Sequence, residues 1–517
     1  MGYEPSAPPS SEQASVLTVG RAGTGGVLAA MCTCLVLVVA SVSALNLAMP
    51  DLAIDLSAST TSLTWIADAY TVALAAFVLP IGALGDRVGR RNVLVGGTIV
   101  FAVGSIAAGL VHSTELLIGW RAVMGIGAAM IMPGTLSTIT AAFPADRRDR
   151  GVAVWSGFAA AGAIIGLLAA GFLLRQWSWR SIFITSAVVA LVGGLLAVLL
   201  APNTRDEERR PLDHAGAWTS AVAIGGLVYG IIEGSEVGWT SGRVVAGFTV
   251  SVAALVLYAV LGFRNSHPLL DPRLFGIRGF RAGAITILVQ FMAVFGFFFV
   301  GLQYLQLILG YSPLESAVAL IPIAVVVLPT SALTPKLSRR VGIKTVMGIG
   351  LLLLAAGMFA LSFLEADSGY WPFFGGLIVS GLGVGMTSAV GTAVIVGSLR
   401  AEQQGVASAM NDATREVGSA VGIALMGSVF AGHYKSALPT LQGLPPQAAH
   451  AVESSAAAGI HVAGLVGPQG PAVEAAVKSA FISGLSHSLV AVAIIVAVAV
   501  AGVGALLFAP HDQTPPE

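Results

Sequence analysis

The run from Trp65 to Arg91 combines one carboxylate inside an apolar segment with a charged, glycine-rich segment directly after it. Asp68 lies near its start, and Asp86 follows 18 positions later. At about 1.5 Å per residue these positions are roughly 27 Å apart along a helix, close to the thickness of a bilayer's hydrocarbon core. A carboxyl group in that setting, with Trp65 and Tyr70 beside it, can bind an organic cation or exchange a proton.

Other ionisable residues also lie inside apolar runs. Arg121 occupies one run, and Asp412, Arg415 and Glu416 occupy another. Asp412 and Arg415 are three apart and share a helix face. Such a pair neutralises itself and leaves Glu416 as the surplus acid, which is what a proton site needs. We place Glu416 near the middle of the membrane, and Asp68, Arg121, Asp412 and Glu416 are our candidate proton-coupling residues.

Each of these residues has a simpler explanation. Arg121 near Asp68 could keep that carboxylate ionised, and the pair could equally be a purely structural salt bridge. Arg121 could also extend to the membrane interface. For the charged residues around Arg415, the simpler explanation is packing inside a polar bundle without any role in proton transfer.

The composition is that of a polytopic membrane protein. Hydrophobic residues make up 56% of the chain and charged residues only 10%, whereas soluble domains carry about 25% charged residues. The 26 basic and 26 acidic residues cancel, so nothing suggests nucleic-acid binding. Cys32 and Cys34 lie two apart in the first apolar run, which favours a packing role over a disulfide or metal site.

The sequence predicts fourteen membrane-spanning helices and an all-α fold. Lys and Arg concentrate in the N-terminal tail and the even-numbered loops, so we expect both termini in the cytoplasm and the chain in the cytoplasmic membrane. The predicted helices cover 27–49, 63–84, 92–111, 113–136, 151–174, 181–201, 215–233, 244–263, 280–309, 314–335, 343–363, 371–395, 405–430 and 481–508.

An internal echo indicates two related halves. LGDRVG at 84–89 reappears as LSRRVG at 337–342, and both segments follow a predicted helix at a matching place in the helix count. We therefore expect two six-helix bundles with two inserted helices between them. The predicted division is a disordered tail 1–26, an N-terminal bundle 27–202, inserted helices 203–264, a linker 265–279, a C-terminal bundle 280–508 with a long extracellular loop 431–480, and a tail 509–517.

The loop after the second helix carries the most specific motif. GALGDRVGRR at 82–91 fits G-x-L-x-D-R-x-G-R-[RK] at every specified position. The chain thereby resembles the major facilitator superfamily, whose hallmark is this loop. The resemblance implies the major facilitator fold and a gating role for Gly82, Gly85, Asp86, Arg87, Gly89 and Arg90.

Further motifs refine the resemblance. The run around Arg121 is similar to the superfamily's helix-4 motif, with Met124 in place of the usual glutamine. Helix 5 keeps the small residues of the antiporter motif but has Leu167 where the proline falls. Helix 1 ends like that of the fourteen-helix drug:proton antiporters, with Ser41 where most relatives have an aspartate. The run 410–418 resembles their helix 13.

The resemblance implies proton-coupled efflux of lipophilic, cationic or neutral drugs by alternating access, by a transporter of the EmrB/QacA type. The alternative is a uniporter or symporter for a small nutrient or metabolite, suggested by the missing proline and aspartate. The sequence shows no nucleotide-binding loop and no catalytic or metal cluster, so we expect no enzyme activity and no cofactor. We expect a monomer that contacts the bilayer, protons and small lipophilic substrates. The candidate cavity residues are Asn46, Trp65, Tyr70, Phe295, Gln303, Tyr304 and Asn411.

Overall fold

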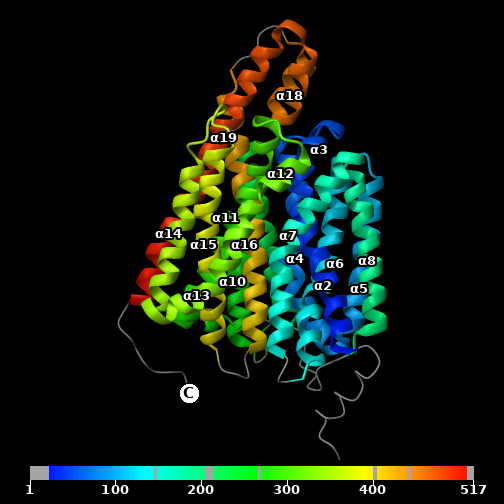
Figure 1. Cartoon of the computed structure of the whole chain (residues 1–517), viewed down its shortest axis with the longest axis vertical. Coiled ribbons are helices and arrows are strands. Elements are labelled where there is room, and N and C mark those ends of the chain that lie inside the picture. The colour runs from blue at the N-terminus through cyan, green and yellow to red at the C-terminus, as the bar shows by residue number, and fades with distance from the viewer. Residues whose placement is uncertain are drawn as a thin grey trace, which may run out of the picture.

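A computed structural model describes residues 23–508, except 145–147, 204–212, 266–267, 269–270, 400–403 and 440–443. All of the regular structure in these ranges is helical. Figure 1 shows the long helices standing side by side, with a short helical hairpin rising above one end.

Each of the fourteen predicted apolar runs falls on a helix or on two consecutive helices, and further short helices lie between them. In order they are α2 (Gly23–Leu47), α3 (Met49–Asp55), α4 (Thr60–Val88), α5 (Arg90–Leu110), α6 (Thr114–Ala142), α7 (Arg148–Gln176), α8 (Arg180–Leu200), α9 (His214–Val237), α10 (Gly242–Arg264), η1 (Pro272–Gly276), α11 (Arg278–Gln303), η2 (Tyr304–Ile308), α12 (Pro313–Ala319), α13 (Ile321–Val341), α14 (Ile343–Leu361), α15 (Tyr370–Gly397), α16 (Gln404–Ala437), α17 (Pro446–Ser454), α18 (Ala456–Leu465), η4 (Gly467–Gln469) and α19 (Gly470–Phe508).

Thirteen helices or helix pairs within the described ranges are long and apolar enough to cross a membrane. The remaining predicted span is α7, whose described apolar part is Gly162–Gln176. The structure lengthens two elements: α16 continues to Ala437 and α19 begins at Gly470, so the expected loop 431–480 shrinks to 438–469. This shorter connection contains the two short helices α17 and α18.

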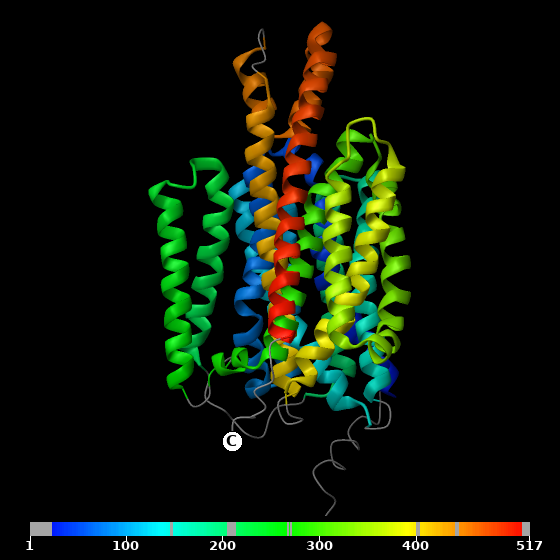
Figure 2. The same cartoon turned by 90° about the vertical axis from the view of Figure 1, so that its left-hand side faces the viewer.

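The long helices pack as two groups. Helices α2, α4, α5, α6, α7 and α8 contact one another, as do α11, α13, α14, α15, α16 and α19. The groups meet where α4 packs on α16 and α7 packs on α12. The inserted pair α9–α10 leans on both groups through α9, which contacts α4 and α16, and Figure 2 shows this pair at the edge of the molecule.

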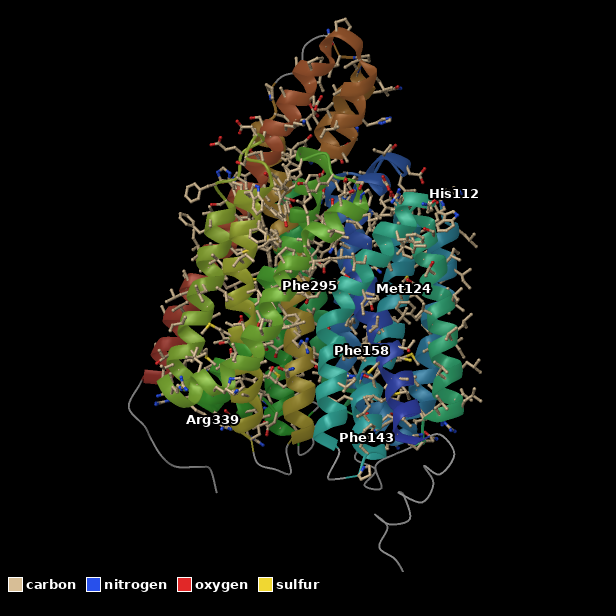
Figure 3. The ribbon with its side chains drawn as sticks, viewed as in Figure 1. His112, Met124, Phe143, Phe158, Phe295 and Arg339 are labelled. Carbon is tan, nitrogen blue, oxygen red and sulfur yellow. The ribbon has the colours of Figure 1, made fainter. Side chains whose placement is uncertain are left out.

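The two ends of the bundle differ in character. We call the end with the hairpin of α17 and α18 the α18 end; the loop residue His112 lies there (Figure 3). The opposite end, where Figure 3 shows Arg339, is the arginine-rich end. It carries Arg87, Arg90 and Arg91 at the junction of α4 and α5.

In the structure, the two copies of the repeated sequence segment form equivalent tight junctions between consecutive helices. Gly89 alone separates α4 from α5, and Gly342 alone separates α13 from α14. Their φ angles are +120° and +90°, in the region that L-residues with a side chain rarely adopt. A Cβ on Gly89 would also lie 2.6 Å from Asn203 Oδ1. The side chain of Asp86, in the same motif, lies outside the described residues.

Small residues allow the close crossings of α7. A Cβ on Gly166 would lie 2.6 Å from the Cα of Ala40 on α2, and one on Gly171 would lie 2.8 Å from the Cα of Leu314 on α12. Because these glycines of α7 have no side chain, the backbones of α2 and α12 can approach α7 closely. Helix α2 also buries both free cysteines, Cys32 and Cys34, which confirms their packing role.

Candidate functional site

Asp68 lies at the junction of the two helix groups and the inserted pair. Its neighbours on the same face of α4, Trp65 and Val72, pack in one apolar cluster with α9 and α16. The partners in that cluster are Val228 and Ile232 of α9 and Ala420 and Ala424 of α16.

The Asp68 side chain is fully buried (0% exposed). One carboxyl oxygen accepts a hydrogen bond from the Thr71 hydroxyl, and the other, Oδ2, has no hydrogen-bond partner. An ionised carboxylate buried in this way is costly, and taking up a proton removes that cost. The geometry therefore suits a group that keeps a bound proton while the junction is closed.

Arg121 is also buried, with 1% of its surface exposed, but it does not pair with Asp68. Its Nε donates to the Ile66 carbonyl at 3.1 Å, and its terminal nitrogens approach the carbonyls of Ala67 and Ser41 at 3.4 and 3.5 Å. The guanidinium carbon lies 4.5 Å from the centre of the Tyr70 ring. The expected ion pair does not form because Tyr70 follows Asp68 by two positions and so lies on nearly the opposite face of α4.

Tyr70 connects Arg121 with α2. Its ring lies against the Arg121 guanidinium, and its hydroxyl donates to the Val38 carbonyl of α2 at 3.0 Å. Glu416 is half-buried, so it is more accessible than Asp68. The expected pair forms beside it, with Arg415 Nη1 3.9 Å from Asp412 Oδ1.

The candidate cavity residues of α11 and η2, together with Phe291, divide into two sets. Phe291 and Phe295 are half-buried and stack with ring centres 5.8 Å apart, and the Arg415 guanidinium lies 4.6 Å from the Phe291 ring centre. Figure 3 shows Phe295 near mid-height of the bundle. This set, together with Glu416, remains a candidate wall of a substrate cavity.

The second set packs inside the C-terminal group. Tyr304 is fully buried and stacks on Phe373 of α15 at 5.6 Å. Gln303 donates to the Phe299 carbonyl of its own helix at 2.8 Å. Both residues were expected to line the cavity, and here they serve helix packing instead.

The two candidate asparagines occupy different surroundings. Asn411 Oδ1 accepts from the Thr392 hydroxyl of α15 at 3.1 Å, within the C-terminal group. Asn46, at the end of α2, is 1% exposed, and its amide nitrogen has no hydrogen-bond partner. Asn46 therefore offers an unused donor at the α18 end of the N-terminal group.

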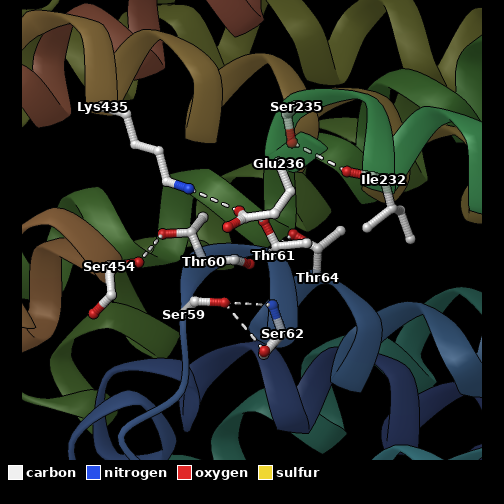
Figure 4. Close-up of polar contacts among 10 residues, drawn as sticks. All are labelled: Ser59, Thr60, Thr61, Ser62, Thr64, Ile232, Ser235, Glu236, Lys435 and Ser454. Atoms are coloured by element: carbon white, nitrogen blue, oxygen red, sulfur yellow. Dashed lines mark hydrogen bonds and ion pairs between the residues drawn. The ribbon is translucent and has the colours of Figure 1, made fainter. Parts of the chain in front are cut away.

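Sequence reasoning missed two carboxylates at the end of α9. Glu236 accepts from the Thr61 hydroxyl of α4 at 2.9 Å and pairs with Lys435 of α16 at 2.7 Å (Figure 4). Glu233, one turn earlier, accepts from the Trp65 indole at 3.0 Å. An acid inside an apolar run is a signal for function, and Glu233 was that signal at the end of the predicted helix 215–233.

The polar contacts of the N-terminal group with α9, α17 and η2 gather at the α18 end. Gln306 donates to the Leu47 carbonyl at 3.0 Å, and Thr60 donates to the Ser454 carbonyl of α17 at 3.1 Å. A Cβ on Gly427 of α16 would lie 2.5 Å from the Thr64 hydroxyl oxygen of α4. The N-terminal group (α2 and α4 to α8) forms side-chain hydrogen bonds with α9, α17 and η2. Among the described residues, all of these bonds lie toward the α18 end. We call this set of contacts the closed seam.

Among the described residues, no group of three His, Cys, Asp or Glu side chains has a geometry that could hold a metal ion.

Comparisons with known proteins agree with this architecture. The chain is similar to the multidrug efflux pump LfrA of Mycolicibacterium smegmatis, 32% identical over 89% of this chain and 92% of that protein. It is 30% identical to the methyl viologen resistance protein SmvA of Salmonella typhimurium, over 86% of this chain and 90% of that one. The tetracenomycin C resistance and export protein of Streptomyces glaucescens is also 30% identical, over 91% and 89%.

Solved transporters share the fold. A bacterial homologue of the human lysosomal transporter Spinster, inward-facing and occupied, superposes with a TM-score of 0.68 at 16% identity, covering 93% of this chain and 96% of that one. The peptide transporter POT in complex with sulfate gives a TM-score of 0.64 at 14% identity, covering 96% and 99%. The family model described as Major Facilitator Superfamily matches residues 31–423. The chain is therefore a multi-pass membrane transporter, not an enzyme, and belongs to the major facilitator superfamily.

Proposed function

We propose that this protein exports lipophilic cationic or neutral drugs across the cytoplasmic membrane in exchange for protons. The relatives named for multidrug efflux and methyl viologen resistance support this cargo. The observation that carries the coupling is Asp68, a buried carboxyl with one unpartnered oxygen at the junction of α4, α9 and α16.

The proposed mechanism is alternating access. With the seam closed at the α18 end, Asp68 is sealed and Glu416 is partly accessible. Separating α4 from α16 would expose Asp68 to the other side, so a proton could bind or leave only when the helix groups rock. Proton entry down the membrane potential supplies about 2.3 kcal/mol per 100 mV.

Several finer assignments belong to this proposal. We place the arginine-rich end and both termini in the cytoplasm, which makes this conformation inward-facing, and we take the protein to be a monomer of the fourteen-helix EmrB/QacA type. We keep the bundles at 27–202 and 280–508, with the inserted helices at 203–264. We assign proton coupling to Asp68, Arg121, Asp412 and Glu416, charge pairing to Arg415, and gating to the motif 82–91.

Transport by the purified chain in proteoliposomes tests the function. We expect an imposed proton gradient to drive movement of the cationic dye ethidium against its own gradient. Asp68→Asn should abolish driven movement, because the amide cannot carry the proton, while ethidium binding persists. The matched control is Asp367→Asn, which neutralises an exposed acid in the loop between α14 and α15.

Two results would contradict the proposal. If ethidium moved at equal rates with and without the proton gradient, the chain would be a facilitator, as the nutrient uniporter alternative requires. If Asp68→Asn retained driven transport, coupling would have to be assigned to Glu416 instead, and Glu416→Gln would locate it.

A further inference from the structure

An open recess lies directly above the closed seam. It has a volume of about 540 Å³ and is lined by residues from the ends of α9 and α16, the start of α4, and α17. This volume falls within the range of sites that hold drug-sized molecules. The lining residues are Ser59, Glu236, Lys435, Leu438, Pro439, Ala449, His450, Glu453 and Ser454.

The charges of the recess favour a cation. Glu236 and Lys435 neutralise each other at 2.7 Å, and Figure 4 shows this pair between α9 and α16. Glu453, on α17, is exposed and forms no ion pair with any basic side chain among the described residues. The recess therefore has one surplus carboxylate.

The rest of the lining suits an organic molecule. Leu438, Pro439 and Ala449 contribute apolar surface, while Ser59 and Ser454 contribute hydroxyl groups. A small inorganic cation would gain nothing from the apolar part. A large monovalent organic cation can place its charge near Glu453 and its apolar groups on these side chains.

We propose that this recess is a second binding site, which takes an amphipathic organic cation on the α18 side of the closed seam. The class of occupant rests on the proposed function, because the recess lies where α4, α9 and α16 must separate to release cargo. The site itself rests on the volume, the lining and the surplus carboxylate.

Occupancy of this site acts on the seam. A cation in the recess lies next to Glu236 and competes with Lys435 for its carboxylate. It also repels the Lys435 ammonium, because like charges at short range destabilise each other. A departing cation thus weakens the contact that ties α16 to α9.

Equilibrium binding of radiolabelled tetraphenylphosphonium to the purified full-length chain tests the site. We expect two bound cations per chain, one in the central cavity and one in the recess. Glu453→Gln should weaken only one of the two affinities, by about fivefold, and Leu438→Trp, which fills the recess, should remove that site. The control Glu474→Gln changes an acid on α19 that pairs with Lys478 outside the recess and should change neither affinity.

The outcomes separate the two proposals. A single bound cation whose affinity ignores Glu453→Gln and Leu438→Trp would overturn the second site and leave the export function intact. Absence of any bound cation would overturn both the recess as a cation site and the cationic cargo. Equal binding of tetraphenylborate, the anion of the same shape, to the recess would also overturn the proposal.

Discussion

The Lys435 ammonium lies 2.7 Å from the Glu236 carboxylate and thereby ties α16 of the C-terminal group to α9 of the inserted pair. Thr61 extends the connection to α4 at 2.9 Å. Both charged side chains are about one-third exposed, at 35% and 38%. An ion pair of this exposure contributes on the order of 1 kcal/mol or less, a strength that suits a contact broken in every transport cycle.

Reversing one charge of this pair should open the seam. In Glu236→Lys, the two ammonium groups repel, and we expect the open population to rise about fivefold, the ratio that about 1 kcal/mol gives. The measurement is the rate at which a membrane-impermeant maleimide labels Ala424→Cys, a position that is fully buried in the apolar cluster with Trp65 and Val72 of α4.

The matched double variant is Glu236→Lys with Lys435→Glu, which restores opposite charges. It should return the labelling rate close to that of the unmodified pair. Lys478→Glu, which disrupts an ion pair within α19 alone, should leave labelling unchanged. If the double variant labelled as fast as the single one, the pair would not be what closes the seam.

Replacing Arg121 by lysine should disable transport and lower stability. A lysine cannot direct donors to three carbonyls from a planar fork and cannot stack on Tyr70 in the same way. We expect a loss of about 2–4 kcal/mol in the free energy of unfolding. Tyr70→Phe keeps the ring beneath the guanidinium and loses only the bond to Val38, so it should cost about 1 kcal/mol. Thermal unfolding in detergent measures both, and similar losses for the two variants would contradict this role.

The two junction glycines should differ in their tolerance of alanine. Both have positive φ, so each substitution should cost about 1–3 kcal/mol. Gly89→Ala adds a clash, because its Cβ would lie 2.6 Å from Asn203 Oδ1, whereas the nearest atom to a Cβ on Gly342 is 4.0 Å away. Melting temperatures should therefore fall further for Gly89→Ala, and Asn203→Gly should recover the difference. Equal losses in the two alanine variants would show that the contact with Asn203 is harmless.

Acid should weaken the attachment of α3 to α8. The Trp179 indole donates to Asp55 at 2.9 Å and Arg180 pairs with it at 2.9 Å, and these contacts lower the pKa of that carboxyl. A lowered folded-state pKa means that the stabilisation is complete above the unfolded value of about 4 and is lost as pH falls below it.

The measurement compares melting temperatures between pH 6 and pH 3. The background is Asp51→Asn, since partial desolvation beside the helix ends and the nearby Asp55 raise the pKa of Asp51, so that its titration has the opposite sign. Adding Asp55→Asn should flatten the fall in melting temperature toward pH 3. An unchanged slope would mean that other carboxyl groups dominate acid unfolding.

Sequence patterns predicted the fold because each membrane helix requires a long apolar run, which is easily recognised in the sequence. Apolar runs placed the long helices, and the repeat of one loop motif anticipated the junctions at Gly89 and Gly342, where only a residue free to adopt positive φ fits. The pair Asp412–Arg415 was predictable since a spacing of three fixes a shared helix face.

Contacts between helices were less predictable. Asp68 and Arg121 looked like partners because both are charged and buried, but the face on which Tyr70 lies receives Arg121, and Asp68 faces α9 and α16. Tyr304 and Gln303 were assigned to the cavity wall with the aromatic run of the same segment, but Tyr304 stacks on Phe373 and Gln303 bonds to the Phe299 carbonyl. Glu236 escaped notice because the predicted helix ended three residues before it.

The burial of Cys32 and Cys34 inside α2 has a practical result. Water-soluble thiol reagents cannot reach either sulfur. A single cysteine introduced at the closed seam, the recess or a junction is therefore the one thiol that such a reagent labels, and the two natural cysteines need not be replaced.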